Sequence, residues 1–200
     1  MNAFSIVSDF EQKVADYAGA KYGIAVDCCT SAIFLSLKYC QHLGLRPKEV
    51  ECPARTYASV PMAVIHSGYK LKLVDRMWVG TYELSPLPVI DGAKRFRRGM
   101  YSGGLHCLSF HAKKILAIGR GGMVLTDDPE AARWLRKARY DGREGKPYPE
   151  EKIDVLGWHC YMTPEQAARG SLLMDLLPES PKDHLEDYPD LRQMPVFHGQ

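Results

Sequence analysis

The chain has 200 residues, of which 46% are hydrophobic and 25% charged, enough for about one soluble globular domain with a real core. Its 26 Lys and Arg residues against 24 Asp and Glu residues leave a formal charge of +2, too little to indicate a nucleic-acid coat or a membrane-surface protein from bulk charge. No run of about 18 apolar residues is present, so no segment is predicted to span a membrane.

The predicted elements alternate between short apolar runs and helical stretches. In chain order, we expect a helix at 10–18, a strand at 22–26, a helix at 30–43, a strand at 49–52, a helix at 57–66, strands at 69–74, 88–90, 105–110 and 123–126, and helices at 128–140 and 164–177. The last helix begins with a capping box, Thr163 as N-cap and Gln166 at the third helical position. This order predicts an α/β domain with a mostly parallel sheet.

The six cysteines lack the paired spacings that a zinc site requires, so we expect no metal site. Neighbouring Cys28 and Cys29 are poor partners for a shared disulfide. The first residues show no basic stretch followed by an apolar one, so no signal peptide is expected. The sequence therefore predicts a cytoplasmic protein with reduced thiols.

Ligands of such sheets bind at the carboxyl ends of the strands, so the loops after the predicted strands are the places to look for chemistry. After the first strand, Thr30 and Ser31 open a helix whose hydroxyls and free N–H groups would suit a phosphate; taken alone, they are better explained as helix caps. After the second strand comes Tyr57, which would stack on a planar ligand or fill the core.

Two further loops carry charged side chains. Asp91 follows the strand at 88–90 and would be a fixed anion, suited to a protonated ring nitrogen; the plain alternative is a turn formed by Asp91-Gly92. Lys113 and Lys114 follow the strand at 105–110, close to a glycine-rich turn, and a lysine there forms a Schiff base if its pKa is lowered. Pyridoxal phosphate needs this combination: a phosphate cup, a ring stack, an anion and a lysine.

At these residues the chain resembles the DegT/DnrJ/StrS-type sugar aminotransferases, which are fold type I pyridoxal-phosphate enzymes. The resemblance covers nearly all of residues 7–177. The matching motifs are Cys29-Thr30-Ser31-Ala32 for G-T-S/A-A, Pro53 to Tyr57 for P-x-x-T-aromatic, Asp91-Gly92-Ala93 for D-x-A, Ser109 to Lys114 for S-F-H-x-x-K, and Gln166-Ala167-Ala168 for Q-A-A.

The resemblance implies the three-layer large domain of fold type I, over residues 1–178. Residues 179–200 are rich in Pro, Asp and Glu, and this composition predicts a loosely packed tail. The resemblance also implies that Lys114, and not Lys113, binds the cofactor and shuttles a proton, and that Asp91 pairs with the ring nitrogen. The other implied cofactor-binding residues are Cys29, Thr30, Ser31, Tyr57, Ser109 and His159. Implied partners are a keto-sugar attached to a nucleotide, an amino donor, usually glutamate, and a second subunit that shares the active sites.

The chain also departs from the family pattern. The stretch between residues 76 and 90 is too short for the strand and helix that relatives usually carry there, and we expect the usual small C-terminal domain to be missing. Single replacements place Cys29 for Gly, Lys94 for His or Gln, Arg120 for an acidic residue and His159 for Asn. These departures leave two alternatives open: a catalytically degenerate relative acting as a binding or regulatory protein, and a sugar dehydratase, which would carry His instead of Lys114.

A basic run at 94–98 is the remaining feature. It would bind the diphosphate of a nucleotide-sugar through Lys94, Arg97 and Arg98, with His111 also facing the substrate, or it would be a solvated loop. Nucleic acid is the least favoured partner for so short a run.

Overall fold

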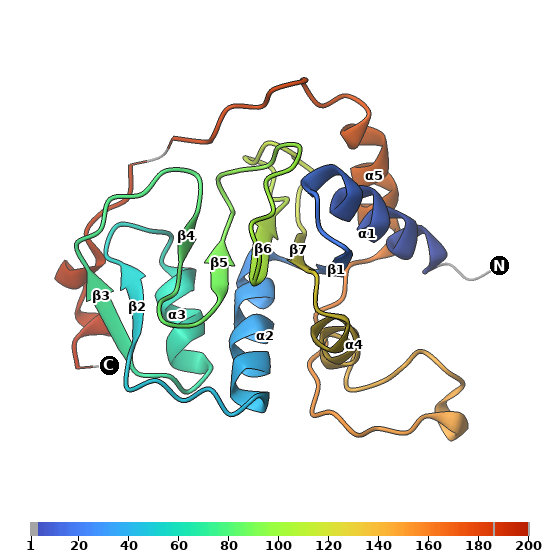
Figure 1. Ribbon diagram of the computed structural model, residues 1–200, viewed down its shortest axis with the longest axis horizontal. Helices are drawn as coiled ribbons and strands as arrows, with labels where there is room; N and C mark the ends of the chain where they lie inside the picture. Colours follow the sequence, from blue (N-terminus) through green and yellow to red (C-terminus); the bar gives the residue numbers. More distant parts are fainter. Residues whose placement is uncertain (1–3, 186, 200) are drawn as a thin grey trace.

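The computed structural model describes residues 4–185 and 187–199 as an α/β fold (Figure 1). Every predicted strand is present within two residues of its expected bounds, and one short strand, β4, was not predicted. The strands are β1 Tyr22–Val26, β2 Val50–Pro53, β3 Leu71–Val74, β4 Tyr82–Glu83, β5 Val89–Asp91, β6 Leu105–Ser109 and β7 Gly122–Thr126.

The five predicted helices are all present. They are α1 Ser5–Ala18, α2 Cys29–His42, α3 Ser59–His66, α4 Pro129–Ala138 and α5 Pro164–Met174, with 3-10 turns η1 Tyr148–Glu150, η2 Leu191–Gln193 and η3 Pro195–Phe197. Helix α1 ends at Gly19, whose φ of 85° is the left-handed conformation that glycine adopts at low cost. The predicted capping box of α5 is confirmed. Among the described residues, no helix is both long and apolar enough to cross a lipid bilayer.

The main sheet is mixed, which corrects the expectation of a mostly parallel sheet. Its order is β1-β7-β6-β5-β4, and only the β5–β6 ladder is parallel. Strands β1, β5 and β6 run in one direction, whereas β7 and β4 run against it. The segment between β6 and β7 contains no helix that could carry the chain back across the sheet, so β7 returns antiparallel to its neighbour. The α/β class itself is confirmed.

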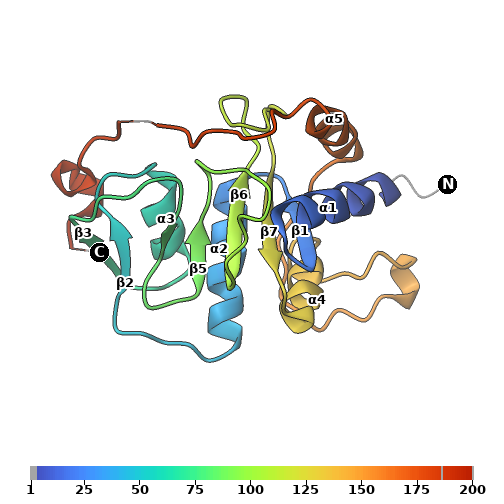
Figure 2. The same ribbon diagram turned by 45° about the horizontal axis from the view of Figure 1, so that its top comes forward.

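Helices cover both faces of the sheet, which confirms the three-layer arrangement. Helices α1 and α5 pack together on one face, and α2 and α4 cover the other (Figure 2). Each face has its own buried apolar cluster, one around Phe10 and Phe110 and the other around Ile33 and Leu35. The apolar residues on both faces of β1 and β7 explain why these strands read as continuous hydrophobic runs.

The sheet is interrupted at the short segment between β3 and β5. Strands β2 and β3 form a separate parallel pair beneath α3, and β4 is only two residues long. Leu84 and Leu87 fill the core where a longer segment would lie, and Glu51 of β2 donates a backbone hydrogen bond to Ser85 O at 2.8 Å. The shortened segment therefore keeps the two sheets together without a continuous ladder.

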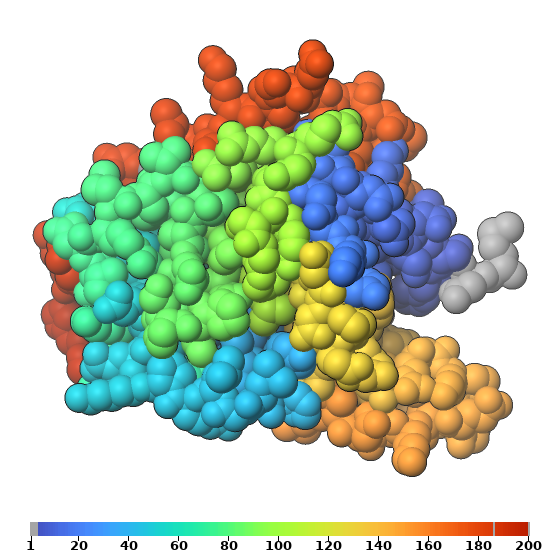
Figure 3. Space-filling view, viewed as in Figure 1, coloured from blue at the N-terminus to red at the C-terminus, as the bar shows by residue number. Residues whose placement is uncertain are grey.

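The C-terminal strap, residues 178–185 and 187–199, crosses the top of the molecule from α5 to the β2–β3 pair (Figure 1) and lies against the upper edge of the fold (Figure 3). Its backbone is attached at two points: His184 N donates to Lys94 O at 2.8 Å and Leu191 N donates to Ala54 O at 2.9 Å. Leu191 is only 1% exposed. The interpretation of this segment as a tail is therefore wrong for its packing, because its apolar side chains join the core.

Candidate functional site

The predicted site residues come from loops at the same edge of the sheet as the strap. The loops that follow β1, β5 and β6 meet the first turn of α2 there, because the carboxyl ends of strands running the same way share one edge. The site has two ends, which we call the ring end, around Asp91, and the phosphate end, at residues 28–31.

Asp91 is the last residue of β5 and lies 4% exposed at the ring end. Its Oδ1 accepts a hydrogen bond from Ala93 N at 2.8 Å and its Oδ2 accepts one from the Tyr82 hydroxyl at 2.7 Å. Burial raises the pKa of Asp91, while these two hydrogen bonds and the positive charges of Lys114 and Lys94 act against the rise. The carboxyl group of Asp91 is thus buried and held in one orientation.

Lys114 lies in the loop after β6, where its backbone N donates to His111 O at 2.8 Å. Its ammonium is close enough to lower the pKa of Asp91 and of Cys29, so the structure brings these three predicted residues into one site. Within the described residues Lys114 Nζ makes no hydrogen bond or ion pair, which leaves the amine available for chemistry.

The phosphate end is the start of α2. Cys28 is its N-cap, in extended conformation, and no described side chain caps the first turn. The hydroxyls of Thr30 and Ser59 are 2.8 Å apart, and Ser31 Oγ lies 3.3 Å from Cys28 Sγ. Ser109 Oγ accepts only a long bond, 3.5 Å, from His111 N. Free N–H groups with hydroxyls beside them are what an anion at a helix N-terminus requires.

The first residues of β7 hold the phosphate end in place. A Cβ added at Gly122 would lie 2.5 Å from Cys29 N, so only glycine allows the two backbones to come this close. Arg120, which replaces an acidic residue of the family pattern, pairs with Asp27 at 2.7 Å. Cys29 is a neutral thiol here, because burial and the nearby Asp91 raise its pKa well above its ordinary value.

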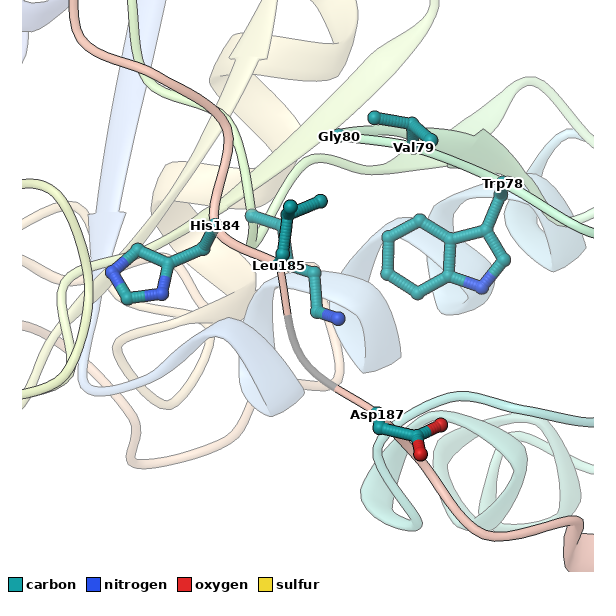
Figure 4. Close-up of a pocket in the computed structure, with 7 residues that line it drawn as sticks. Trp78, Val79, Gly80, His184, Leu185 and Asp187 are labelled. Carbon is teal, nitrogen blue, oxygen red and sulfur yellow. The ribbon is translucent and has the colours of Figure 1, made fainter.

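Lys94, whose charge acts on Asp91 at the ring end, forms part of a pocket. Figure 4 shows Trp78, His184, Leu185 and Asp187 around this pocket. Lys94 Nζ lies 4.8 Å from the centre of the Trp78 ring and 4.1 Å from that of Tyr188, and the side chain is buried. The pocket has a volume of about 340 Å³, and its wall opposite Trp78 belongs to the strap. It is lined by Trp78, Gly80, Lys94, His184, Leu185 and Asp187, among others.

The other basic side chains of the run at 94–98 do not converge on one site. Arg95 instead forms an ion pair with Asp183 of the strap, at 2.6 Å, which lies directly over Gly80. Arg98 stacks on Tyr17, with the guanidinium 5.1 Å from the ring centre, and Arg97 is exposed. Only Lys94 of the expected diphosphate contacts lies beside Asp91.

Besides Arg97 and Arg98, three further predicted residues lie outside this group. Tyr57 is 62% exposed, with its ring 6.5 Å from that of Tyr188. His111 is exposed in the loop that carries Lys114. His159 binds Asp141, Nδ1 to Oδ2 at 2.6 Å, on a projecting arm at residues 140–160. Their roles stay predictions.

Sequence reasoning missed the side chains that surround the ring end. Tyr82 lies in a strand too short for any periodicity, and Trp78 precedes it in an irregular loop. Tyr188 belongs to the strap, whose composition resembles a tail. Thr56 was within a quoted motif, but its burial against Tyr82 depends on a contact between distant segments.

The residues present fit pyridoxal phosphate. A buried carboxylate, a free lysine amine and an uncapped helix N-terminus with hydroxyls lie in one site, and these are the groups that a ring nitrogen, an aldehyde and a phosphate require. Lys94 and Lys114 both act on Asp91, so its carboxylate would face two lysine charges in addition to a cationic ring.

Comparisons with known proteins place the chain. A sequence model of the DegT/DnrJ/EryC1/StrS aminotransferase family matches residues 3–89 and 97–188. GDP-perosamine synthase of Caulobacter vibrioides is 27% identical over 86% of this chain and 57% of its own length. Spore coat polysaccharide biosynthesis protein SpsC of Bacillus subtilis is 28% identical over 65% of this chain and 44% of its own length.

Solved structures agree in fold. The aminotransferase TlmJ from Streptoalloteichus hindustanus superposes with a TM-score of 0.72 at 23% identity, over 87% of this chain and 59% of that one. The chain thus spans about half the length of the curated relatives that it matches. The matched family and the aminotransferase fold imply pyridoxal phosphate as the cofactor.

Proposed function

The chain belongs to the DegT/DnrJ/EryC1/StrS aminotransferase family, and on this premise we propose that it transfers an amino group to a keto-sugar with pyridoxal phosphate as cofactor. The observation that carries the proposal is the meeting of the buried Asp91 carboxylate with the free amine of Lys114 in one site. We further propose that the acceptor is nucleotide-linked and that glutamate is the donor, which the name of the Caulobacter relative supports for the sugar.

Lys114 has two roles in this proposal. When bound, pyridoxal phosphate supplies an aldehyde and a ring that takes up negative charge from the substrate carbon. Lys114 Nζ would hold the cofactor through that aldehyde, and the same amine, when not so engaged, would take up and return the proton of the substrate carbon. Among the residues that the structure describes, Lys114 Nζ forms no ion pair that would have to be broken first, which suits both roles.

The other site residues orient the cofactor. Asp91 keeps the ring nitrogen protonated, because a buried anion stabilises a positive charge strongly where water is excluded. The first turn of α2, with Thr30 and Ser31, and Ser109 from β6 hold the phosphate. Cys29 contributes its backbone N–H there, and Tyr57 covers the ring.

The substrate enters beside Lys94 in this proposal. Lys94, whose charge acts on Asp91, lines the same pocket as Trp78. Arg98 instead stacks on Tyr17, and the exposed Arg97 supplies long-range attraction for a diphosphate. His111 lies three residues before Lys114, in the same loop after β6.

We also propose a homodimer. The arm at residues 140–160 leaves the hydrophobic side chains of Tyr148, Ile153 and Leu156 exposed, and Leu156 is 83% exposed. Exposed apolar side chains on a projecting arm are typical of a surface that a second subunit covers, and His159 would reach the partner's site from this arm. All six cysteines are free, which supports a reducing compartment such as the cytoplasm.

The proposal is tested by identifying the lysine that binds the cofactor. The purified chain is incubated with pyridoxal phosphate, reduced with borohydride and digested, and the labelled peptide is located by mass spectrometry. We expect the label on Lys114, its loss in Lys114→Ala, and its retention in the matched variant Lys113→Ala. A label on another lysine, or none, contradicts the proposal.

A second step distinguishes the alternatives. Glutamate should convert the bound cofactor and remove its visible absorbance if the chain is a transaminase. A degenerate relative that only holds the cofactor keeps its colour with every amino donor. A dehydratase would release water from the sugar without consuming an amino donor, and the presence of Lys114 in place of His argues against it.

A further inference from the structure

Three side chains form a buried polar chain that ends on Asp91. The Tyr82 hydroxyl lies 2.7 Å from Asp91 Oδ2 and 2.6 Å from Thr56 Oγ1. All three residues are buried, Thr56 to 2% exposure. Thr56 follows β2, Tyr82 is in β4 and Asp91 is in β5. These hydrogen bonds therefore link the end of the β2–β3 sheet to the main sheet.

The direction of these hydrogen bonds follows from the number of protons. An ionised carboxylate only accepts, so the single hydroxyl proton of Tyr82 points to Asp91. Thr56 must then donate its own proton to the Tyr82 oxygen. With Ala93 N on the other oxygen, both oxygens of Asp91 receive a donor, and the plane of the carboxylate is fixed.

The position of Tyr82 is set by the short segment that departs from the family pattern. In the antiparallel β4–β5 ladder Tyr82 is paired directly with Asp91. Side chains at such paired positions lie on the same face of the sheet, within about 5.5 Å at Cβ. Tyr82, which contacts the carboxylate proposed to pair with the cofactor ring, therefore comes from the segment between residues 76 and 90.

Other titratable side chains face Asp91 from the neighbouring helix, strands and loops. Cys29 of α2, Cys52 of β2 and Cys107 of β6 are thiols whose pKa burial raises, so they stay neutral. Lys94 and Lys114 are the positive charges that act on Asp91. Burial likewise raises the pKa of Tyr82 well above its ordinary value, so its hydroxyl keeps the proton.

We infer that Tyr82 is a positioning residue for Asp91: its hydroxyl, held by Thr56, donates to one carboxylate oxygen and keeps Asp91 ionised and oriented toward a protonated ring nitrogen. The part of the inference that concerns the ring nitrogen rests on the proposed function. The hydrogen bonds to Asp91 do not depend on it. A hydrogen bond donated to the charged form favours that form, so its loss makes Asp91 easier to protonate.

The first experiment needs no cofactor. Asp91 is titrated in the full chain by carbon-13 NMR of labelled aspartate, and its signal is assigned by its disappearance in Asp91→Asn. In Tyr82→Phe we expect proton binding by Asp91 to tighten about tenfold. Tyr69→Phe is the matched control, because it removes another buried hydroxyl, one that donates to Leu45 O at 2.9 Å.

Variants of Thr56 test the second bond. Thr56→Val should tighten proton binding by Asp91 in the same direction but by less than Tyr82→Phe, since Tyr82 remains. Thr56→Ser keeps the hydroxyl and should restore the behaviour of the unsubstituted chain. An Asp91 titration that stays unchanged in Tyr82→Phe overturns the inference. If Tyr82→Phe does not fold, an unchanged titration in Thr56→Val overturns it instead.

The second experiment measures binding of two probes, pyridoxal phosphate and its analogue with carbon in place of the ring nitrogen. Tyr82→Phe should weaken pyridoxal phosphate about tenfold and leave the analogue unchanged, since only the former needs the Asp91 anion. Equal loss for both probes means that Tyr82 acts only on packing. Failure of Lys114 labelling would contradict the proposed function alone, because the titration without cofactor stands independently.

Discussion

The two ends of the site are built in different ways. The phosphate end comes mostly from neighbours in the chain: Cys28 and Ser31 lie in the same helix turn, while Ser59 of α3 meets Thr30 and Gly122 of β7 packs against Cys29. The ring end draws on Thr56, Tyr82 and Asp91 from three segments, and the strap crosses beside it.

This difference has a consequence for the effects of substitutions. At the phosphate end a hydroxyl is expected to contribute to binding of the proposed cofactor but little to the packing of the fold. At the ring end, the side chains that would bind the cofactor also connect the two sheets and lie beside the strap. Substitutions there are therefore expected to change cofactor binding and the free energy of unfolding together. Three substitutions test this contrast, two at the ring end and one at the phosphate end.

The largest effect is expected where the strap joins the core. Leu191→Ala should lower the free energy of unfolding by about 2–5 kcal/mol, because Leu191 is fully buried and its removal leaves a cavity. Urea unfolding measures the change. Leu185→Ala is the matched control on the same strap: Leu185 is 82% exposed, and its loss should change the free energy of unfolding by less than about 0.5 kcal/mol. Equal effects would show that the strap is not anchored by its buried side chains.

The second effect depends on pH. His106 of β6 lies behind Asp91, 2.6 Å from where a Cβ of Gly92 would be, and within the described residues neither ring nitrogen has a hydrogen-bond partner. Burial, with a smaller contribution from Arg95, lowers the pKa of His106 from 6.5 to about 4. The unfolded chain therefore binds this proton at a higher pH than the folded protein does.

The sign follows directly: stability due to neutral His106 is present above pH 6.5 and is lost as the pH falls toward 4. We expect a loss of about 3 kcal/mol across this range. Urea unfolding at pH 7 and pH 4.5 should show a smaller loss in His106→Asn than in the unsubstituted chain. His66→Asn, at an exposed position, should keep the full loss. The same pH dependence in both variants would assign it to other groups.

The smallest effect on stability is expected at the phosphate end. Ser31→Ala should weaken binding of pyridoxal phosphate about tenfold, through the loss of one hydrogen bond to a charged group. Its free energy of unfolding should stay within about 0.5 kcal/mol, since Ser31 contacts only the Cys28 thiol through its hydroxyl. Ser8→Ala, on the exposed side of α1, is the control for both measurements. Unfolding at markedly lower urea in Ser31→Ala would remove the contrast between the two ends.

The sequence by itself determined the elements and the phosphate end. Helices such as α2 and strands such as β1 were predicted because the apolar period and the residues that end an element act over a few neighbours. The first turn of α2 with Thr30 and Ser31 is local for the same reason. The placement of Asp91 and Lys114 in loops at one edge followed from the strand order, once an α/β fold was assumed.

Only the tertiary structure decided the sheet directions and the ring end. The antiparallel return of β7, the partner of Tyr82 and the packing of Leu191 each depend on contacts between residues far apart in the chain. A two-residue strand and a polar terminal segment carry no periodic pattern, so nothing in their local sequence specifies a partner. Burial of Leu191 and the Tyr82–Asp91 hydrogen bond exist only once the whole fold brings these segments together.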